Sequence, residues 1–303
     1  MIGHYRGCSS LNHKKDCVVL CELEDATGIT PQDLTNFDPG MDNPRLRLQW
    51  ASGRRTTEPE DIAYSLFGIF NVYLPIIPGE SAENALGRLL GEIISQSEDL
   101  SVLSWVGEAS PFHSCFPAHI TSYQSEPCAA SSLPANEFQT SMSDFAPHEV
   151  DAFVKSLSAS NRPHFNGRQL SLPCIMYRVA RVDWKRVDPG STFHMHVILA
   201  EDLEPIDLVL PHELQSLILR PLLHTLVRPW DSKLLGSFPN ANNTLVAKRL
   251  FTMFSQPFSV LLLEKTSPQD EYYKRIASSL PIFASPASAA SIIRSKVQIV
   301  TIM

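Results

Sequence analysis

The sequence predicts an α+β fold, in which a helical N-terminal segment precedes a mostly antiparallel, β-rich C-terminal domain. Apolar residues recur at intervals of three and four up to about residue 96, which is typical of helices. From about residue 170 they alternate every second residue, which is typical of strands. A stretch rich in Pro and Ser lies between the two patterns. The expected organisation is therefore a helical segment over residues 1–107, a linker over 108–147 that wraps over the surface, and a β-rich domain over 148–303.

Two helices are expected in the middle of the helical segment. Residues 57–70 begin with the form of a capping box, in which the Thr57 hydroxyl accepts from the Glu60 amide and the Glu60 carboxylate reaches back to the Thr57 amide. Residues 82–96 carry an unbroken apolar stripe over about four turns. Gly87 and Gly91 lie four residues apart in this second helix and weaken it. Because glycine has no side chain, we expect these two positions to admit another backbone at close range.

Shorter elements surround these two helices. Residues 16–24 are predicted to form a helix that Gly28 ends, and residues 30–44 are predicted to be mostly loop because prolines and aspartates interrupt them. Residues 100–105 have the pattern of a short buried strand. Residues 148–160 are expected to form an amphipathic helix, followed by a turn at Asn166-Gly167.

The C-terminal domain is expected to be an antiparallel sheet, a sandwich or an irregular barrel, because its strands follow one another without long helices between them. The predicted strands cover residues 172–182, 193–199, 206–210, 222–227, 246–254, 260–263, 272–277 and 297–302. For residues 246–254 a helix remains an alternative. Arg178, Arg181 and Lys274 interrupt the apolar runs and are expected to face solvent.

Charge and hydropathy exclude several classes of partner. The net charge is −7, and residues 1–110 carry 8 Lys and Arg against 16 Asp and Glu. This acidity argues against a nucleic-acid surface and against an anionic membrane surface. No apolar run approaches the ~18 residues that a membrane span needs, and no secretory signal is apparent at the N-terminus. We therefore expect a soluble, cytoplasmic protein.

The acidic segment contains one cationic cluster, formed by Arg45, Arg47, Arg54 and Arg55. Its side chains can pair with the nearby Glu58, Glu60 and Asp61, or they can contact a partner carboxylate or bind an anion. The structural pairing is favoured because the carboxylates are adjacent in sequence.

Three groups of residues resemble metal ligands, and in each the structural interpretation is preferred. Cys8, Cys17 and Cys21 lie near His4 and His13, but Cys17 and Cys21 also fit two apolar positions of one helical turn. A second group contains His113, Cys115 and His119. A third group pairs His194 with His196 on one strand face, with His212-Glu213 as the candidate for a third ligand. We expect no metal and no cofactor.

The sequence also resembles a known family. Residues 50–57 (WASGRRTT) and 60–70 (EDIAYSLFGIF) resemble the stretch that follows the HET domain in fungal heterokaryon-incompatibility proteins, and Pro75, Gly79-Glu80 and residues 88–93 continue the similarity. Thr27-Gly28-Ile29 is similar too. A weaker similarity to the C-terminal regions of basidiomycete members covers residues 227–230 (VRPW), 256–258 (QPF) and 273–278 (YKRIAS).

The chain also departs from the family pattern. Members usually place a HET domain, itself similar to TIR domains, before this stretch, which is often treated as a small domain of unknown function. Residues 1–43 are too short for a HET domain, so we expect it to be missing, as in a truncated gene model, a split product or a degenerate paralogue. The usual Tyr-Gly-Glu-Gly of the family is Pro78-Gly79-Glu80-Ser81 here.

Two functional hypotheses follow from the resemblance. The first is a non-catalytic part of an incompatibility protein, a scaffold or regulatory module for non-self recognition and programmed cell death, whose partner is a protein, in particular one with a HET domain. The second is an NAD-consuming, TIR-like enzyme of the same pathway, if a HET domain is supplied. The second needs a catalytic glutamate in a nucleotide cleft, and local structure already accounts for Glu60 and Glu80, so we assign no catalytic residue.

Overall fold

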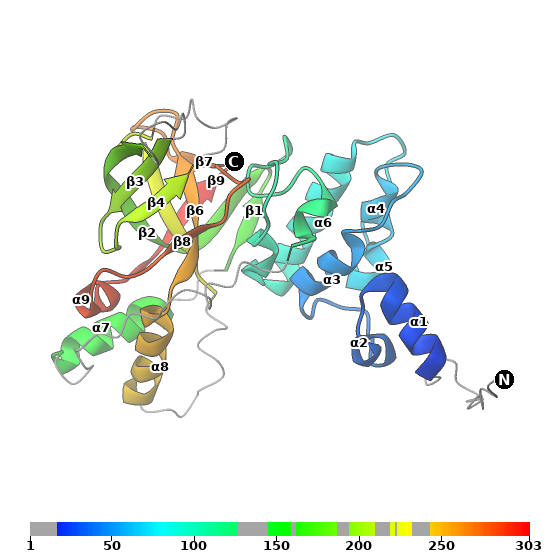
Figure 1. Ribbon diagram of the computed structural model, residues 1–303, viewed down its shortest axis with the longest axis horizontal. Coiled ribbons are helices and arrows are strands. Elements are labelled where there is room, and N and C mark those ends of the chain that lie inside the picture. The colour runs from blue at the N-terminus through cyan, green and yellow to red at the C-terminus, as the bar shows by residue number, and fades with distance from the viewer. Residues whose placement is uncertain are drawn as a thin grey trace.

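The computed structural model describes residues 17–125, 145–158, 162–186, 194–209, 219–221, 223–231 and 243–303. Helices dominate the N-terminal part and strands the C-terminal part, which confirms the predicted α+β class. In Figure 1 helices α1 to α6 lie to one side of the strands, and α7, α8 and α9 lie together beneath them. None of the helices in the described part of the chain is both long and apolar enough to cross a bilayer.

The N-terminal part consists of short helices around one long helix. Its elements are α1 (Cys17–Thr27), α2 (Pro31–Thr35), α3 (Pro44–Ala51), α4 (Asp61–Tyr64), α5 (Phe67–Phe70), α6 (Ala82–Ser97) and the 3₁₀ helices η2 (Leu100–Leu103) and η3 (Ile120–Tyr123). Gly28 follows α1 with a positive φ of 68° and donates its N–H to the Glu24 carbonyl at 2.7 Å, so glycine ends this helix as predicted. Helix α6 confirms the predicted apolar stripe, and Ser81 caps it by accepting from the Asn84 N–H at 3.3 Å.

The predicted helix over residues 57–70 is two single turns, and the predicted capping box is absent. The first turn, α4, begins at Asp61 after Glu60, and no side chain caps it. The Glu60 carboxylate instead accepts from the Gly79 N–H at 3.3 Å. Ala63, Leu66 and Phe70 are fully buried across the break. Helical spacing thus correctly indicated the buried side of the segment, but it does not require one continuous helix.

One further segment differs from its prediction, whereas residues 30–44 are mostly loop as predicted, apart from one short helix, and residues 246–254 take the helical alternative. Residues 100–105 contain η2 in place of a strand, because the Asp99 carboxylate accepts from the Ser101 N–H at 2.8 Å and favours a local turn. The segment predicted to be mostly loop over residues 30–44 contains α2, capped by Thr30. Residues 246–254 belong to a helix, α8 (Asn243–Ser255), with Ala247, Leu250 and Phe254 buried at helical spacing.

The strands pair into one sheet whose order among the described residues is β4-β3-β2-β5-β6-β7-β9, with β1 on β2 and β8 on β6. They are β1 (His164–Asn166), β2 (Gln169–Arg186), β3 (His194–Ala200), β4 (Ile206–Val209), β5 (His224–Pro229), β6 (Phe258–Glu264), β7 (Tyr272–Ile276), β8 (Ile282–Ala284) and β9 (Val297–Ile302). The pairs are antiparallel except for β7 and β9. Cys174 and Ile175 of β2 pair with both β5 and β9, so strands β2, β5, β6, β7 and β9 close into a ring.

Alternating side chains of these strands enter two separate hydrophobic cores. Leu170, Leu172 and Cys174 of β2 pack with α6 and the other N-terminal helices, in what we call core 1. Ile175, Tyr177 and Val179 of the same strand pack with α7 (Pro147–Ser158), α8 and α9 (Ala289–Ile293), in core 2. Since successive strand residues point to opposite faces, one strand serves both cores.

The first part of the predicted linker is folded into core 1. Cys115, Phe116 and Tyr123 are completely buried, so residues 108–125 do not wrap over the surface as expected. Residues 126–144 lie outside the described part of the chain. His113 joins this segment to β9, since its ring Nε2 lies 3.0 Å from the Ile302 carbonyl oxygen and its Nδ1 accepts from the Cys115 N–H at 3.1 Å. Both ring nitrogens of this predicted metal candidate therefore bind main chain.

We predict opposite effects from alanine at the two glycines of α6. A Cβ on Gly87 would lie 2.7 Å from Cγ of the Phe112 ring, whereas a Cβ on Gly91 meets nothing closer than Phe165, at 3.9 Å. The close neighbour is thus a ring and not the backbone that we expected. Gly87→Ala should lower the free energy of unfolding by about 1–3 kcal/mol. Gly91→Ala should raise it by up to about 1 kcal/mol, through helix propensity. Urea denaturation of both variants measures the difference, and equal effects would contradict this packing.

We also predict that His113 makes the fold sensitive to acid. Burial, opposed in part by the bond to Ile302, lowers the pKa of His113 from 6.5 to about 4. Between these values the unfolded chain binds a proton that the folded chain does not. The free energy of unfolding should therefore fall as pH falls from about 6.5 to 4, by up to about 3 kcal/mol. Denaturation at several pH values should show a flatter profile over this window for His113→Gln, and parallel profiles would exclude this role.

Candidate functional site

The four arginines that were predicted to form one cluster separate into two pairs. Arg45 and Arg47 are buried on α3, whereas Arg54 and Arg55 follow that helix and are exposed. None of the ion pairs between described residues involves Glu58, Glu60 or Asp61 with any of the four, so the favoured structural pairing is wrong. The predicted cluster is therefore not a single cationic surface.

The buried pair holds the main chain of neighbouring segments. Arg47 donates to the carbonyl oxygens of Asp42, Ile69 and Asp38 at 2.7, 2.8 and 2.9 Å. Burial lowers the pKa of Arg47, although the nearby carboxylates of Asp42 and Asp38 raise it. Arg45 donates from Nε to the Ser104 carbonyl at 2.7 Å and from Nη2 to the Ser125 carbonyl. These hydrogen bonds occupy the donors that an anion would require.

Arg54 lines an open hollow of about 670 Å³ beside Trp50, which we call the Trp50 hollow. Its lining also includes Thr27, Gly28 and Gln49, so it brings α1 and α3 together. Guanidinium, amide, hydroxyl and indole groups here can donate hydrogen bonds to a polar or acidic group. Contact of a partner or an anion with Arg54 and Arg55 remains a prediction, now without Arg45 and Arg47.

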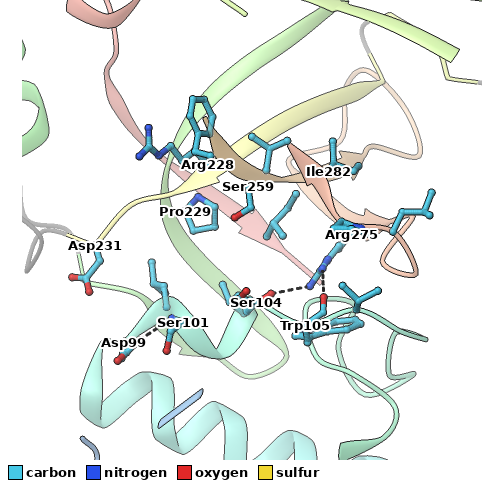
Figure 2. A pocket seen from close by; sticks show the side chains of 18 residues that line it. Asp99, Ser101, Ser104, Trp105, Arg228, Pro229, Asp231, Ser259, Arg275 and Ile282 are labelled. Atoms are coloured by element: carbon cyan, nitrogen blue, oxygen red, sulfur yellow. Dashed lines mark hydrogen bonds between the residues drawn. The ribbon is translucent and has the colours of Figure 1, made fainter. Parts of the chain in front are cut away.

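A second cavity of about 360 Å³ lies between the helical segment and the sheet, and we call it the interlayer cavity (Figure 2). Residues 99–106 form one wall, and the end of β5, the start of β6 and the segment 280–282 form the others. No sequence-based prediction pointed to this cavity. The three motifs of weaker family similarity gave a signal, because Arg228, Phe258 and Arg275 each come from one of them and meet here.

Arg275 of β7 joins the sheet to the helical segment at this cavity. Its Nη1 and Nη2 donate to the carbonyls of Leu103 and Trp105, each at 3.1 Å, as the dashed lines in Figure 2 show. The guanidinium carbon lies 4.1 Å from the centre of the Trp105 ring, a cation–π distance. Figure 2 shows the side chain reaching toward the main chain at Ser104 and Trp105. These contacts make Arg275 primarily a structural residue.

Arg228 is also enclosed by the protein. Its guanidinium carbon lies 4.4 Å from the ring centre of Phe254 and 4.2 Å from that of Phe258, and burial lowers its pKa. Two phenylalanine rings thus flank this guanidinium. Trp230 is buried in core 2 and donates its indole N–H to the Leu157 carbonyl at 2.9 Å.

The two glutamates considered for catalysis both have local partners. Arg88 binds Glu80 through two donors, with Nε 3.1 Å from Oε2, and the Tyr64 hydroxyl donates to Oε1 at 2.6 Å. Burial alone would raise the pKa of Glu80, but the hydrogen bonds from Arg88 and Tyr64 outweigh it and lower the pKa. Neither Glu60 nor Glu80 lines the Trp50 hollow or the interlayer cavity.

The remaining metal candidates do not gather into a site among the described residues, where no group of three potential ligands comes together. Cys17 and Cys21 are exposed thiols on α1. His196 is buried on β3, and His119 is exposed and apart from the buried His113 and Cys115. His4, Cys8, His13 and His212-Glu213 lie outside the described residues.

We predict that Arg275→Met lowers the free energy of unfolding by about 3 kcal/mol. The substitution removes two charge-assisted hydrogen bonds and leaves the buried carbonyls of Leu103 and Trp105 without these donors. The matched control is Lys274→Met, because Lys274 is the exposed neighbour on the same strand and should change stability by less than about 0.5 kcal/mol. Urea denaturation followed by tryptophan fluorescence compares them, and similar losses of stability from both would rule out this stabilising role of Arg275.

The chain is similar to the vegetative incompatibility protein HET-E-1 of Podospora anserina, with 45% identity over 71 residues. The match covers 23% of this chain and 5% of HET-E-1. No protein-family profile matches the chain, and no solved structure matches it. The partial match supports a relationship to a fungal heterokaryon-incompatibility protein family.

Proposed function

We propose that this chain is a non-catalytic part of a fungal heterokaryon-incompatibility protein, which acts as a scaffold or interaction module in non-self recognition. The observation that carries the proposal is the 45% identity over 71 residues to an incompatibility protein. In this proposal residues 1–107 bind a HET domain, either in the same polypeptide or in another one. Residues 148–303 form a β-rich regulatory domain, and the remainder of the predicted linker connects the two.

The arrangement of the carboxylates favours a scaffold over an NAD-consuming enzyme. A catalytic glutamate must contact the substrate, yet Glu80 is bound by Arg88 and Tyr64, and Glu60 accepts from a backbone N–H. Main-chain carbonyls likewise accept hydrogen bonds from the guanidinium groups of Arg45, Arg47 and Arg275. The polar groups most expected to carry chemistry thus stabilise the fold itself.

We expect the full chain to bind at least one member of a panel of purified HET domains, as measured by isothermal titration calorimetry. Co-expression followed by co-purification provides a second measurement of the same association. If no HET domain in the panel binds, the interaction module is excluded.

The enzymatic alternative predicts NAD hydrolysis by the purified chain mixed with a HET domain. Under the scaffold proposal, Glu60→Gln and Glu80→Gln leave any turnover of such a mixture unchanged when each variant is added at a concentration that saturates its binding to the HET domain. Turnover that requires either carboxylate in this chain would decide for the enzyme.

A further inference from the structure

We propose that the loop over residues 71–80, between α5 and α6, is the part of the helical segment that inserts into a partner protein, with Tyr73 and Ile76 as its anchors. The partner surface it fits is an apolar cleft in a folded protein domain, rimmed by Lys and Arg. This inference rests on the proposed function and identifies the contact surface within it.

The loop exposes large apolar side chains to water. Tyr73 is 92% exposed, Ile76 64% and Ile77 46%, all within five residues of one another. Single exposed apolar residues are common on protein surfaces and need no explanation. A contiguous group of them is typical of an interaction site. Tyrosine is also enriched among the residues that dominate binding energy at interfaces.

The backbone of the loop is held by a tight turn. The Glu80 N–H donates to the Ile77 carbonyl at 3.2 Å, which closes a four-residue turn. Pro78 and Gly79 occupy the central positions, and Gly79 has a φ of 77°. A type II turn places proline first and requires a positive φ next, so these two residues suit it. The apolar side chains therefore project from a defined backbone.

Side chains from α4 and α6 form hydrogen bonds with the main chain of the same loop. Arg88 donates from Nη1 to the Pro75 carbonyl at 3.0 Å, while its other donors bind Glu80. The Tyr64 hydroxyl accepts from the Ile77 N–H at 3.2 Å. Helices α4 and α6 lie next to each other in Figure 1, with α4 farther from the sheet than α6.

This network gives the family-like residues a common role. Glu60, Tyr64, Gly79, Glu80 and Arg88 all belong to the stretch with family resemblance, and all of them contact or form the loop. They hold the apolar side chains in place before any partner arrives. Holding a binding loop in advance reduces the entropy lost on association, so it strengthens binding without adding contacts.

The charges around the loop define the chemistry of the partner. Glu58 and Asp61 are exposed next to Glu60, which touches the loop, and Glu83 is partly exposed just after it. Arg88, which contacts the loop at Pro75, is already bound by Glu80. An apolar projection accompanied by exposed carboxylates on the flanking segments complements an apolar cleft with a basic rim. The same carboxylates would be repelled by an anionic lipid surface, which favours a protein partner over a membrane.

The test measures binding of the full chain to the HET domain panel after Tyr73→Ser and Ile76→Ser are combined. We expect the Kd to rise at least thirtyfold for the HET domain that binds, with no change in the urea midpoint, because both side chains are solvent-exposed. The matched control is Tyr272→Ser, since Tyr272 is a 41% exposed tyrosine on β7. Its Kd should remain within twofold of the unmodified chain.

A second variant, Glu58→Gln with Asp61→Asn, tests the basic rim. We expect the association rate to fall several-fold at low salt and its salt dependence to weaken, while the dissociation rate changes little. If the unmodified chain binds and the Tyr73/Ile76 variant binds equally well, the loop is not the contact and the proposed function stands. If the unmodified chain binds no HET domain, both the loop inference and the proposed function fail.

Discussion

Buried guanidinium groups that bind main-chain carbonyls hold the helical segment against the sheet. Arg45 reaches from α3 to the Ser104 carbonyl, and Arg275 reaches from β7 to the carbonyls of Leu103 and Trp105. Residues 103–105 are therefore fixed from both the helical side and the sheet side. A buried arginine is stable only where its donors are satisfied, so each of these contacts requires the others to be in place. The interlayer cavity lies where the two layers meet around this contact.

Strand β2 connects core 1 to core 2, because it contributes side chains to both. Its first half contributes to core 1 with the N-terminal helices, and its second half contributes to core 2 with α7, α8 and α9. Residues 108–125 add buried aromatic side chains to core 1 and connect through His113 to β9. The helical segment and the β-rich domain consequently share core 1, so the helical segment buries its apolar surface only against the sheet, while core 2 is built from residues 150–297 alone. Any partner that binds the helical segment binds an element already coupled to the sheet.

The functional picture follows from where polar groups find their partners. The side chains of Glu80, Arg88 and Tyr64 hydrogen-bond to one another and hold the loop over residues 71–80. Arg47 donates hydrogen bonds to the main-chain carbonyls of Asp38 and Asp42. Exposed side chains of the same stretch include Arg54 and Arg55, the apolar side chains of that loop, and Glu58 and Asp61. These exposed groups are the ones available to a partner, and they belong to the stretch that resembles incompatibility proteins. Recognition by shape and charge is the chemistry they support.

The sequence alone determined features that depend on neighbouring residues. The α+β class, helix α6, the end of α1 at Gly28 and most strands were predictable, because side-chain periodicity and glycine conformations act locally. The tertiary structure alone decided how the four arginines separate, since burial of Arg45 and Arg47 depends on carbonyls up to 80 residues away. It also decided that residues 108–125 enter a core and that the Glu60 carboxylate binds Gly79. A polar side chain has several possible partners in the sequence, and it binds the one that the folded chain brings within hydrogen-bond distance. That distance depends on the tertiary structure and cannot be read from the order of the residues.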